Sequence, residues 1–176
     1  MRTDYLLERE VEQVLDLLTP ANRLVMRVLL HTGLRIGDAL VLRPQQLKPN
    51  FWITEQKTGK RRQVGLPEPL LSDLRENAGK TWVFPGVNPS RHRTRQAVWK
   101  DVKRAAAAAR LTANAAPHSM RKVYAVQLLE KYGDIDRVRR ALNHSGVEVT
   151  LIYAMADKRL TAKGRRRRGK PGRKMA

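Results

Sequence analysis

The sequence predicts an α+β protein that is mostly α-helical and carries a small antiparallel three-stranded sheet. Two observations support this fold class. Apolar residues recur at helical spacing over most of the 176 residues. Within residues 51–67, two short segments rich in strand-forming residues flank the turn KTGK, a pattern typical of a β-hairpin. The stretch TWVF at 81–84 is the expected third strand.

The first half of the chain is predicted to place this hairpin among capped helices. Thr3 or Asp4 can cap a first helix that continues to about Leu18. A second helix begins with Pro20 at its first position and ends at Gly33. Short helices are expected over IGDALVL, before the hairpin, and over PLLSDLREN, after it.

The second half is predicted to be helical. Thr94 can cap a helix that extends to Arg110. Another helix runs from about His118 to Tyr132, and DIDRVRRALN forms a shorter one. The segment SGVE at 145–148 has the spacing of a capping box and predicts a last helix.

The charge indicates a polyanionic partner. The chain has 36 Lys and Arg against 16 Asp and Glu, which gives a net charge of +20. Residues 158–176 hold ten basic residues and no acid, so half of the net charge belongs to the rest of the chain. Such an excess favours nucleic acid as the partner, with an acidic membrane surface as the alternative.

Several function classes are excluded by residue content. There is no cysteine, which rules out disulfides, thiolate catalysis and cysteine metal sites. No apolar run approaches the roughly 20 residues that span a bilayer, and the N-terminus lacks the core of a signal peptide. We therefore expect a cytoplasmic, nucleoid-associated protein with no membrane contact. No H-E-x-x-H motif or comparable metal-ligand pattern is present.

Basic residues stand at the ends of predicted elements, where a basic side chain can meet an anion. Arg35 lies at the start of the third helix, and Lys57 lies in the hairpin turn. His118 and Arg121 are three residues apart, so they share one face of a helix. His144 comes just before the last predicted helix.

That last helix carries Tyr153, nine residues beyond the histidine. Each of these features alone has a plainer interpretation. Arg35 can pair with Asp38 on the surface, a turn lysine is ordinarily solvated, and Tyr153 can simply pack in its helix.

Together the features resemble the catalytic domain of the tyrosine recombinases, the phage integrase family. The matching strings are TGLRIGDAL, KTGKRRQVGLP, PHSMR and LNHSGVEVTLIYA, in the order and near the spacing of that family. The resemblance implies the DNA breaking–rejoining fold over residues 1–157. From its composition we expect a basic, flexible tail over 158–176. Many members of the family also have an N-terminal core-binding domain, and we expect none here because the match begins almost at residue 1.

The resemblance assigns the phosphate-binding roles. Arg35 and Arg121 would hold the non-bridging oxygens of the scissile phosphate, since a planar guanidinium suits bidentate bonds to phosphate. His118 and His144 would add donors, and His118 would help to remove the proton of the tyrosine.

The resemblance also assigns the bond-changing roles. Tyr153 would attack the phosphate and form a 3′-phosphotyrosyl link, while Lys57 would protonate the departing 5′ oxygen. Asp38 would orient the first arginine box. A phenol has a pKa of about 10, so it needs surrounding cations to act near neutral pH. The arginines would supply this charge, so neither a metal, another cofactor nor ATP is expected.

Contacts to DNA outside this site are expected from two segments. The stretch SRHRTRQAVWK at 90–100 crosses from a loop into a helix that can enter the major groove. A solvated basic face is its plainer interpretation, and Val98 and Trp99 are expected to pack in the core. The candidate DNA-binding residues are Arg93, Arg95, Gln96, Lys100 and, in the tail, Arg165, Arg166, Arg167 and Arg168.

Three hypotheses for function follow. The first is a site-specific recombinase of the integrase, invertase or resolvase type, acting on double-stranded DNA as a homotetramer on synapsed sites, although the free protein can be a monomer. The second is a type IB topoisomerase-like enzyme that cuts and reseals one strand. The third is a DNA-binding regulator that has lost catalysis. A Tyr153-dependent covalent adduct separates the enzymes from the regulator, and a need for two paired sites separates the recombinase from the topoisomerase.

Overall fold

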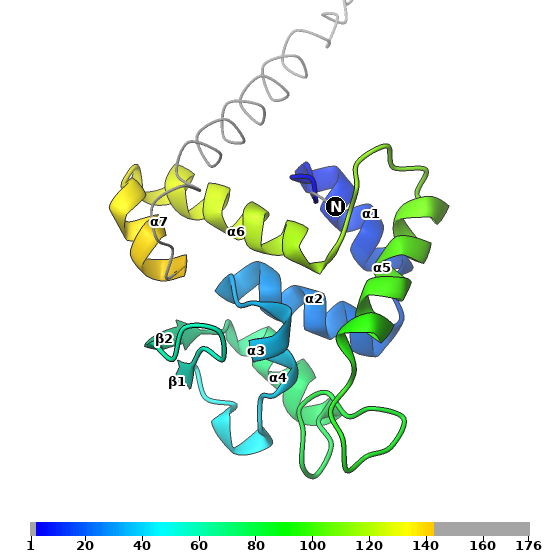
Figure 1. The fold of residues 1–176 in the computed structure, drawn as a ribbon, viewed down its shortest axis with the longest axis vertical. Coiled ribbons are helices and arrows are strands. Elements are labelled where there is room, and N and C mark those ends of the chain that lie inside the picture. The colour runs from blue at the N-terminus through cyan, green and yellow to red at the C-terminus, as the bar shows by residue number, and fades with distance from the viewer. Residues whose placement is uncertain (1–2, 143–176) are drawn as a thin grey trace, which may run out of the picture.

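The computed structural model describes residues 3–142. Helices dominate this part of the chain, with one hairpin inserted early (Figure 1). The elements in chain order are α1 (Glu8–Leu17), α2 (Pro20–Thr32), α3 (Ile36–Leu40), the 3₁₀ turn η1 (Pro44–Gln46), β1 (Asn50–Thr54), β2 (Arg61–Gly65), α4 (Glu68–Asn77), α5 (Arg95–Ala108), α6 (Pro117–Tyr132) and α7 (Ile135–Leu142).

Helix α2 is the central element. It runs through the middle of the molecule, with α6 along one side and α3 and α4 on the other (Figure 1). Its side chains Val25, Met26 and Val28 are wholly buried, as expected for a helix that packs on several neighbours. The C-terminal end of α2 is therefore surrounded by other elements, and the candidate site forms there.

The predicted helix boundaries are confirmed where the signal is local. Thr94 caps α5 through a hydrogen bond from the backbone N–H of Ala97 to its Oγ1, at 3.1 Å. Pro20 and Pro117 each occupy the first position of a helix. Gly33 ends α2 in a left-handed conformation with φ of +62°, which glycine adopts without steric cost.

The predicted cap of the first helix is wrong. Helix α1 begins at Glu8, and the backbone N–H of Leu7 donates to the carboxylate of Glu10 at 2.7 Å. Asp4 instead pairs with Asn114 in the loop before α6, where its carboxylate accepts the Asn114 backbone N–H at 2.8 Å. A long-range contact therefore takes the group that was expected to cap α1.

The predicted hairpin is confirmed, but the sheet within residues 3–142 has two strands and not three. Strands β1 and β2 are antiparallel, with Phe51 opposite Val64, and both of these side chains face the core. The TWVF segment lies apart from them. The backbone N–H of Val83 donates to the Leu42 carbonyl at 3.0 Å, and the Phe84 carbonyl accepts from the loop that precedes α5. These loop hydrogen bonds replace the ladder that a third strand requires.

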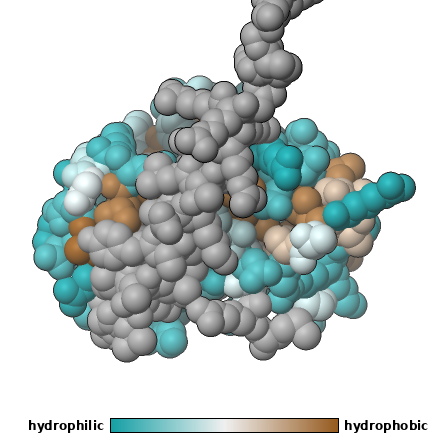
Figure 2. All heavy atoms as spheres, turned by 90° about the horizontal axis from the view of Figure 1, so that it is seen from above, coloured by the Kyte–Doolittle hydropathy of each residue, from teal (hydrophilic) through white to brown (hydrophobic). Residues whose placement is uncertain are grey.

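The described surface seen in Figure 2 is mainly hydrophilic, with a few hydrophobic side chains among the polar ones. Among residues 3–142, the aromatic side chains most open to solvent are those of Trp52 on β1 and Trp99 on α5. Within residues 3–142, no helix combines the length and the apolar character that crossing a bilayer demands. The predicted last helix and its capping box lie outside the described residues.

Candidate active site

A cavity of about 500 Å³ opens where four elements meet. Its walls come from the segment that starts α3, the hairpin turn, and the first residues of α5 and α6. Four basic side chains line it: Arg35, Lys57, Arg95 and His118. Asp38 is the acidic residue in its lining. The fold thus brings together three of the residues that the sequence selected as catalytic, although up to 83 positions separate them along the chain.

Arg35 precedes the first residue of α3 and leaves a quarter of its side chain exposed. Its partner is not Asp38. The Arg35 Nη1 atom lies 2.6 Å from Oε2 of Glu55, the residue that follows β1. Asp38 instead accepts a hydrogen bond from the backbone N–H of Gln56 at 2.9 Å. The Asp38 carboxylate therefore holds the hairpin turn against α3, and Asp38 contacts Arg35 through the backbone, where its N–H donates to the Arg35 carbonyl at 3.0 Å.

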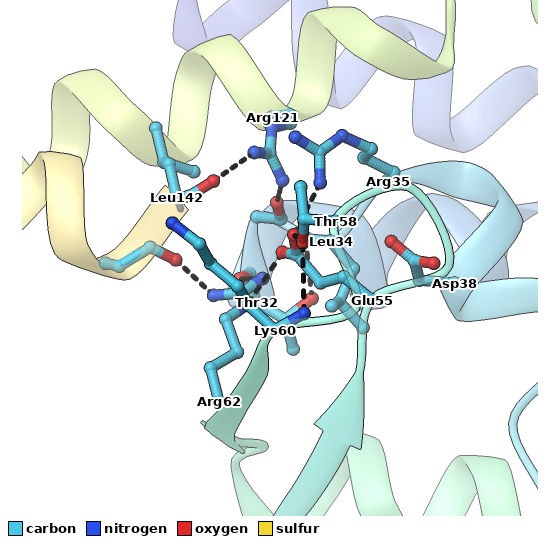
Figure 3. A network of polar contacts seen from close by, with 12 residues as sticks. Thr32, Leu34, Arg35, Asp38, Glu55, Thr58, Lys60, Arg62, Arg121 and Leu142 are labelled. Atoms are coloured by element: carbon cyan, nitrogen blue, oxygen red, sulfur yellow. Dashed lines mark hydrogen bonds and ion pairs between the residues drawn. The ribbon is translucent and has the colours of Figure 1, made fainter. Parts of the chain in front are cut away.

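Glu55 is a residue that the sequence interpretation missed. Its side chain is completely buried between two arginines, with Oε1 3.3 Å from Nε of Arg62 (Figure 3). Burial alone raises the pKa of a carboxyl group, but hydrogen bonds from Arg35 and Thr58 and the charges of both arginines lower the pKa of Glu55 overall. The carboxylate is thus held ionised within a cationic site.

Two buried arginines join the C-terminal ends of α2 and α7 (Figure 3). Arg121 donates to the carbonyl of Gly33 and, at 2.6 Å, to that of Leu142. Arg62 donates to the carbonyl of Thr32 at 3.0 Å and to that of Ala141. Helix C-termini present carbonyls without intrahelical partners, so a guanidinium there is favoured.

The remaining catalytic candidates are placed as follows. Lys57 and His118 are exposed at the cavity, on the hairpin turn and in the first turn of α6. Arg121 is only 2% exposed, three residues further along the same helix. His144 and Tyr153 lie outside the described residues, and His144 follows Leu142 by two positions in the sequence.

The expected DNA-binding residues lie in different surroundings. Gln96 and Lys100 are exposed on α5, whereas Arg93 is half-buried and donates to the side chain of Asn22 at 3.3 Å. Arg95 turns toward the cavity, where its guanidinium carbon lies 3.4 Å from the position that a Cβ on Gly37 would occupy. The bare backbone of this glycine leaves room for the arginine. The four tail arginines at 165–168 lie outside the described residues.

The expectation for the apolar residues of α5 is half right. Val98 is fully buried, but Trp99 is 48% exposed, with the Lys103 ammonium 5.7 Å from its ring centre. The buried face of α5 continues through Val102 and Ala105, and Trp99 lies one residue beyond that face. Among residues 3–142, no three His, Asp or Glu side chains group in a way that could hold a metal ion.

Comparison with known proteins identifies the family. Residues 4–159 match the phage integrase family, and this range includes every residue of the four basic boxes and Tyr153. The chain is 31% identical over 140 residues to the tyrosine recombinase XerD of Rhizobium meliloti, covering 73% of this chain and 45% of that protein. The chain belongs to the phage integrase family.

Solved structures share its fold. The catalytic domain of bacteriophage HP1 integrase superposes with a TM-score of 0.68 at 21% identity, over 93% of this chain and 95% of that one. The XerH site-specific recombinase bound to palindromic difH substrate, in a post-cleavage complex, gives a TM-score of 0.70 at 23% identity, over 93% of this chain and 52% of that one. The chain spans about half the length of the curated relatives that it matches first.

Proposed function

We propose that this chain carries the catalytic domain of a site-specific DNA recombinase, over residues 1–157, followed by a basic tail that contacts DNA. The observation that carries the proposal is the cationic cavity. Four separate elements contribute Arg35, Lys57, Arg95 and His118 to one opening, next to the buried Arg121. A cluster of this kind favours a phosphate that gains charge in its transition state.

The reaction is a transesterification without net hydrolysis. The phenolic oxygen of Tyr153 forms a bond to the scissile phosphorus, and the bond from phosphorus to the 5′ oxygen breaks. His118 takes the proton of the tyrosine, and the ammonium of Lys57 gives one to the departing oxygen. The products are a 3′-phosphotyrosyl link and a free 5′ hydroxyl. Religation by a hydroxyl from a second strand completes the exchange, and the retained ester bond energy makes ATP unnecessary.

The phosphate contacts proposed for Arg35 and Arg121 are supported in different ways. Arg35 lines the cavity and leaves a quarter of its side chain exposed, which supports a direct contact to a non-bridging oxygen. Arg121 donates to two backbone carbonyls and is buried, so its phosphate contact is assigned from the family motif PHSMR. Arg93, Gln96, Lys100 and the tail arginines would bind DNA outside the cavity, in a homotetramer on paired sites in the nucleoid.

Covalent capture tests the proposal. The full chain and its Tyr153→Phe variant are incubated at low salt, in EDTA, with a randomised duplex library that contains nicks. A nick close to the cleavage site lets the cut fragment leave, so the protein stays attached to its DNA. Denaturing electrophoresis then separates covalent from non-covalent complexes.

We expect the wild-type chain to form a denaturation-resistant adduct and the Tyr153→Phe variant to form none. Sequencing the captured DNA would identify the recognised site. An adduct that persists in the variant would contradict Tyr153 as the nucleophile. Binding without any adduct would favour a non-catalytic regulator, and relaxation of supercoiled DNA that needs no second site would favour the type IB topoisomerase-like activity.

A further inference from the structure

We propose that Glu55 is a positioning residue, which fixes the turn that carries Lys57 against Arg35 before DNA binds. The inference rests on the proposed function, because it concerns the general acid of that reaction. It adds to that function a positioning role for a buried carboxylate that forms no bond to the substrate.

The first observation is that one carboxylate oxygen binds both Arg35 and the hairpin turn. Oε2 of Glu55 accepts from Nη1 of Arg35 at 2.6 Å and from Oγ1 of Thr58 at 3.0 Å (Figure 3). Thr58 directly follows Lys57 in the turn. The same atom therefore links the phosphate-binding arginine to the segment that presents the general acid.

The second observation is that the backbone of Glu55 closes the turn. Its N–H donates to the carbonyl of Lys60 at 3.0 Å, and its carbonyl accepts from the N–H of Gly59 at 2.8 Å. The N–H of Gln56 donates to Asp38 on α3 at 2.9 Å. Arg35, just before α3, and Asp38, within it, therefore hold the turn at two points, three positions apart.

The third observation explains why the residue must be an acid. The other oxygen of Glu55 faces Nε of Arg62 at 3.3 Å, and Arg62 also holds the ends of α2 and α7. A neutral side chain at this position would leave the guanidinium groups of Arg35 and Arg62 without the charge between them. A glutamine there would still offer one oxygen to Nη1 of Arg35, so Arg35 keeps an acceptor while the turn loses its charged anchor.

Lys57 itself needs such support. Within residues 3–142 its ammonium makes no hydrogen bond or ion pair, and it is carried by a flexible four-carbon stem. A general acid works only when it lies within hydrogen-bond reach of the oxygen that it protonates. Fixing the backbone of the turn restricts the volume that the ammonium explores, and so raises its effective concentration at the leaving group.

The test uses the DNA identified by covalent capture, in two forms. One has the natural 5′ bridging oxygen at the scissile phosphate, and the other has sulfur in its place. A thiol has a pKa of about 8.5, so a thiolate departs without a proton and cleavage of the sulfur form does not depend on Lys57. Single-turnover cleavage and DNA affinity are measured for the 176-residue chain and its variants.

The variants are Glu55→Gln, Thr58→Val and, as the reference for a missing acid, Lys57→Ala. Thr58→Val keeps the shape of the exposed threonine and both ion pairs of Glu55, so it tests the turn contact should Glu55→Gln fail to fold. The matched control is Glu68→Gln on α4, which removes an exposed carboxylate paired with Arg75, outside the cavity lining.

We expect Glu55→Gln to slow cleavage of the oxygen substrate by about 10-fold or more, with DNA affinity unchanged within about twofold. On the sulfur substrate the defect should fall to about twofold or less, as for Lys57→Ala. Thr58→Val should show the same pattern with a smaller defect. Glu68→Gln should match wild type on both substrates.

Two results would overturn the inference. A Glu55→Gln defect of equal size on both substrates would place the effect on phosphate binding or on the fold rather than on Lys57. Wild-type rates for Glu55→Gln or, where that variant does not fold, for Thr58→Val on both substrates would remove the positioning role.

Amide hydrogen exchange separates this inference from the proposed function. Glu55→Gln should raise exchange over residues 56–60 and leave residues 51–53 in β1 protected, and Thr58→Val should do so to a smaller extent. Unchanged exchange at the turn in every folded variant would overturn the inference whether or not the protein cleaves DNA. If wild type forms no adduct with any DNA, the proposed function fails, and the positioning role for the reaction fails with it even where the turn is held as described.

Discussion

Gly33 and Gly133 have nearly the same backbone conformation in different surroundings. Their φ angles are +62° and +65°, and each ends a helix. A Cβ on Gly33 would lie 2.3 Å from the ring of Tyr124, whereas a Cβ on Gly133 would meet no atom within 4 Å. Gly33 also offers its carbonyl to Arg121, so its position matters to the site.

We predict that Gly33→Ala is much more destabilising than Gly133→Ala. The left-handed conformation costs an alanine about 1 kcal/mol at either position. At Gly33 the contact with Tyr124 adds about 2 kcal/mol of overpacking, because a ring between two packed helices cannot easily move. Urea unfolding of both variants measures the difference, and equal losses of stability would show that the Tyr124 ring moves aside at little cost.

At the scale of elements, a side chain of α5 caps the N-terminal end of α2. The carboxylate of Asp101 accepts the backbone N–H of Thr19 at 3.0 Å, the hydroxyl of the same residue at 2.7 Å, and the side-chain amide of Asn22 at 2.7 Å. Thr19 precedes the first residue of α2 but makes no cap with its own side chain. A residue 79 positions beyond Asn22 thus provides the negative charge that the start of this central helix favours.

We predict that this contact makes stability depend on pH in the acid range. Burial raises the pKa of Asp101, but hydrogen bonds from Asn22, Thr19 and Arg104 outweigh it and lower the pKa to about 2. The folded pKa lies below the unfolded value, so the stabilisation is fully present above about pH 4 and is lost as the pH falls toward 2. Its size is about 2 kcal/mol.

Urea unfolding at pH 6 and pH 2.5 measures this dependence. Asp101→Asn should be less stable than wild type at pH 6, and the gap should narrow at pH 2.5. Asp136→Asn serves as the control, since it removes an exposed pair with Arg139 that contributes about 0.5 kcal/mol or less. A gap that stays constant with pH would contradict the assigned role of Asp101.

At the scale of the whole molecule, charge governs the encounter with DNA. The net charge of +20 is divided evenly between the last 19 residues and the rest of the chain. Counterions released from DNA by bound cations make affinity fall steeply with salt. The proposed contacts can therefore be counted from the slope of that dependence.

We predict that changing the tail arginines at 165–168 to glutamine flattens this slope. Each lost phosphate contact reduces the slope of log affinity against log salt by about 0.9, so the four changes should reduce it by up to about 4. Fluorescence anisotropy with a labelled duplex at several salt concentrations gives the slope. Arg75→Gln, whose charge is already paired with Glu68, should leave the slope unchanged, and an unchanged slope in the tail variant would remove these residues from the DNA contact.

The sequence by itself determined the local elements and the family. Pro20, Thr94 and Gly33 act on their immediate neighbours, so the boundaries that they set could be predicted from residue type alone. The hairpin around KTGK was equally local. The four basic boxes could be recognised because their order and spacing are read directly along the chain, and three of their catalytic candidates, Arg35, Lys57 and His118, line one cavity.

Tertiary structure alone decided how the charges of the site are paired. Nothing in the sequence distinguished Glu55 or Arg62 from the other charged residues, and folding buried both beside Arg35. The absence of a third strand within residues 3–142 has a similar cause, since the backbone N–H of Val83 donates to the Leu42 carbonyl instead of to a neighbouring strand. A buried charge or backbone donor must have a polar partner. Which partner it takes depends on the distant residues that the fold places beside it.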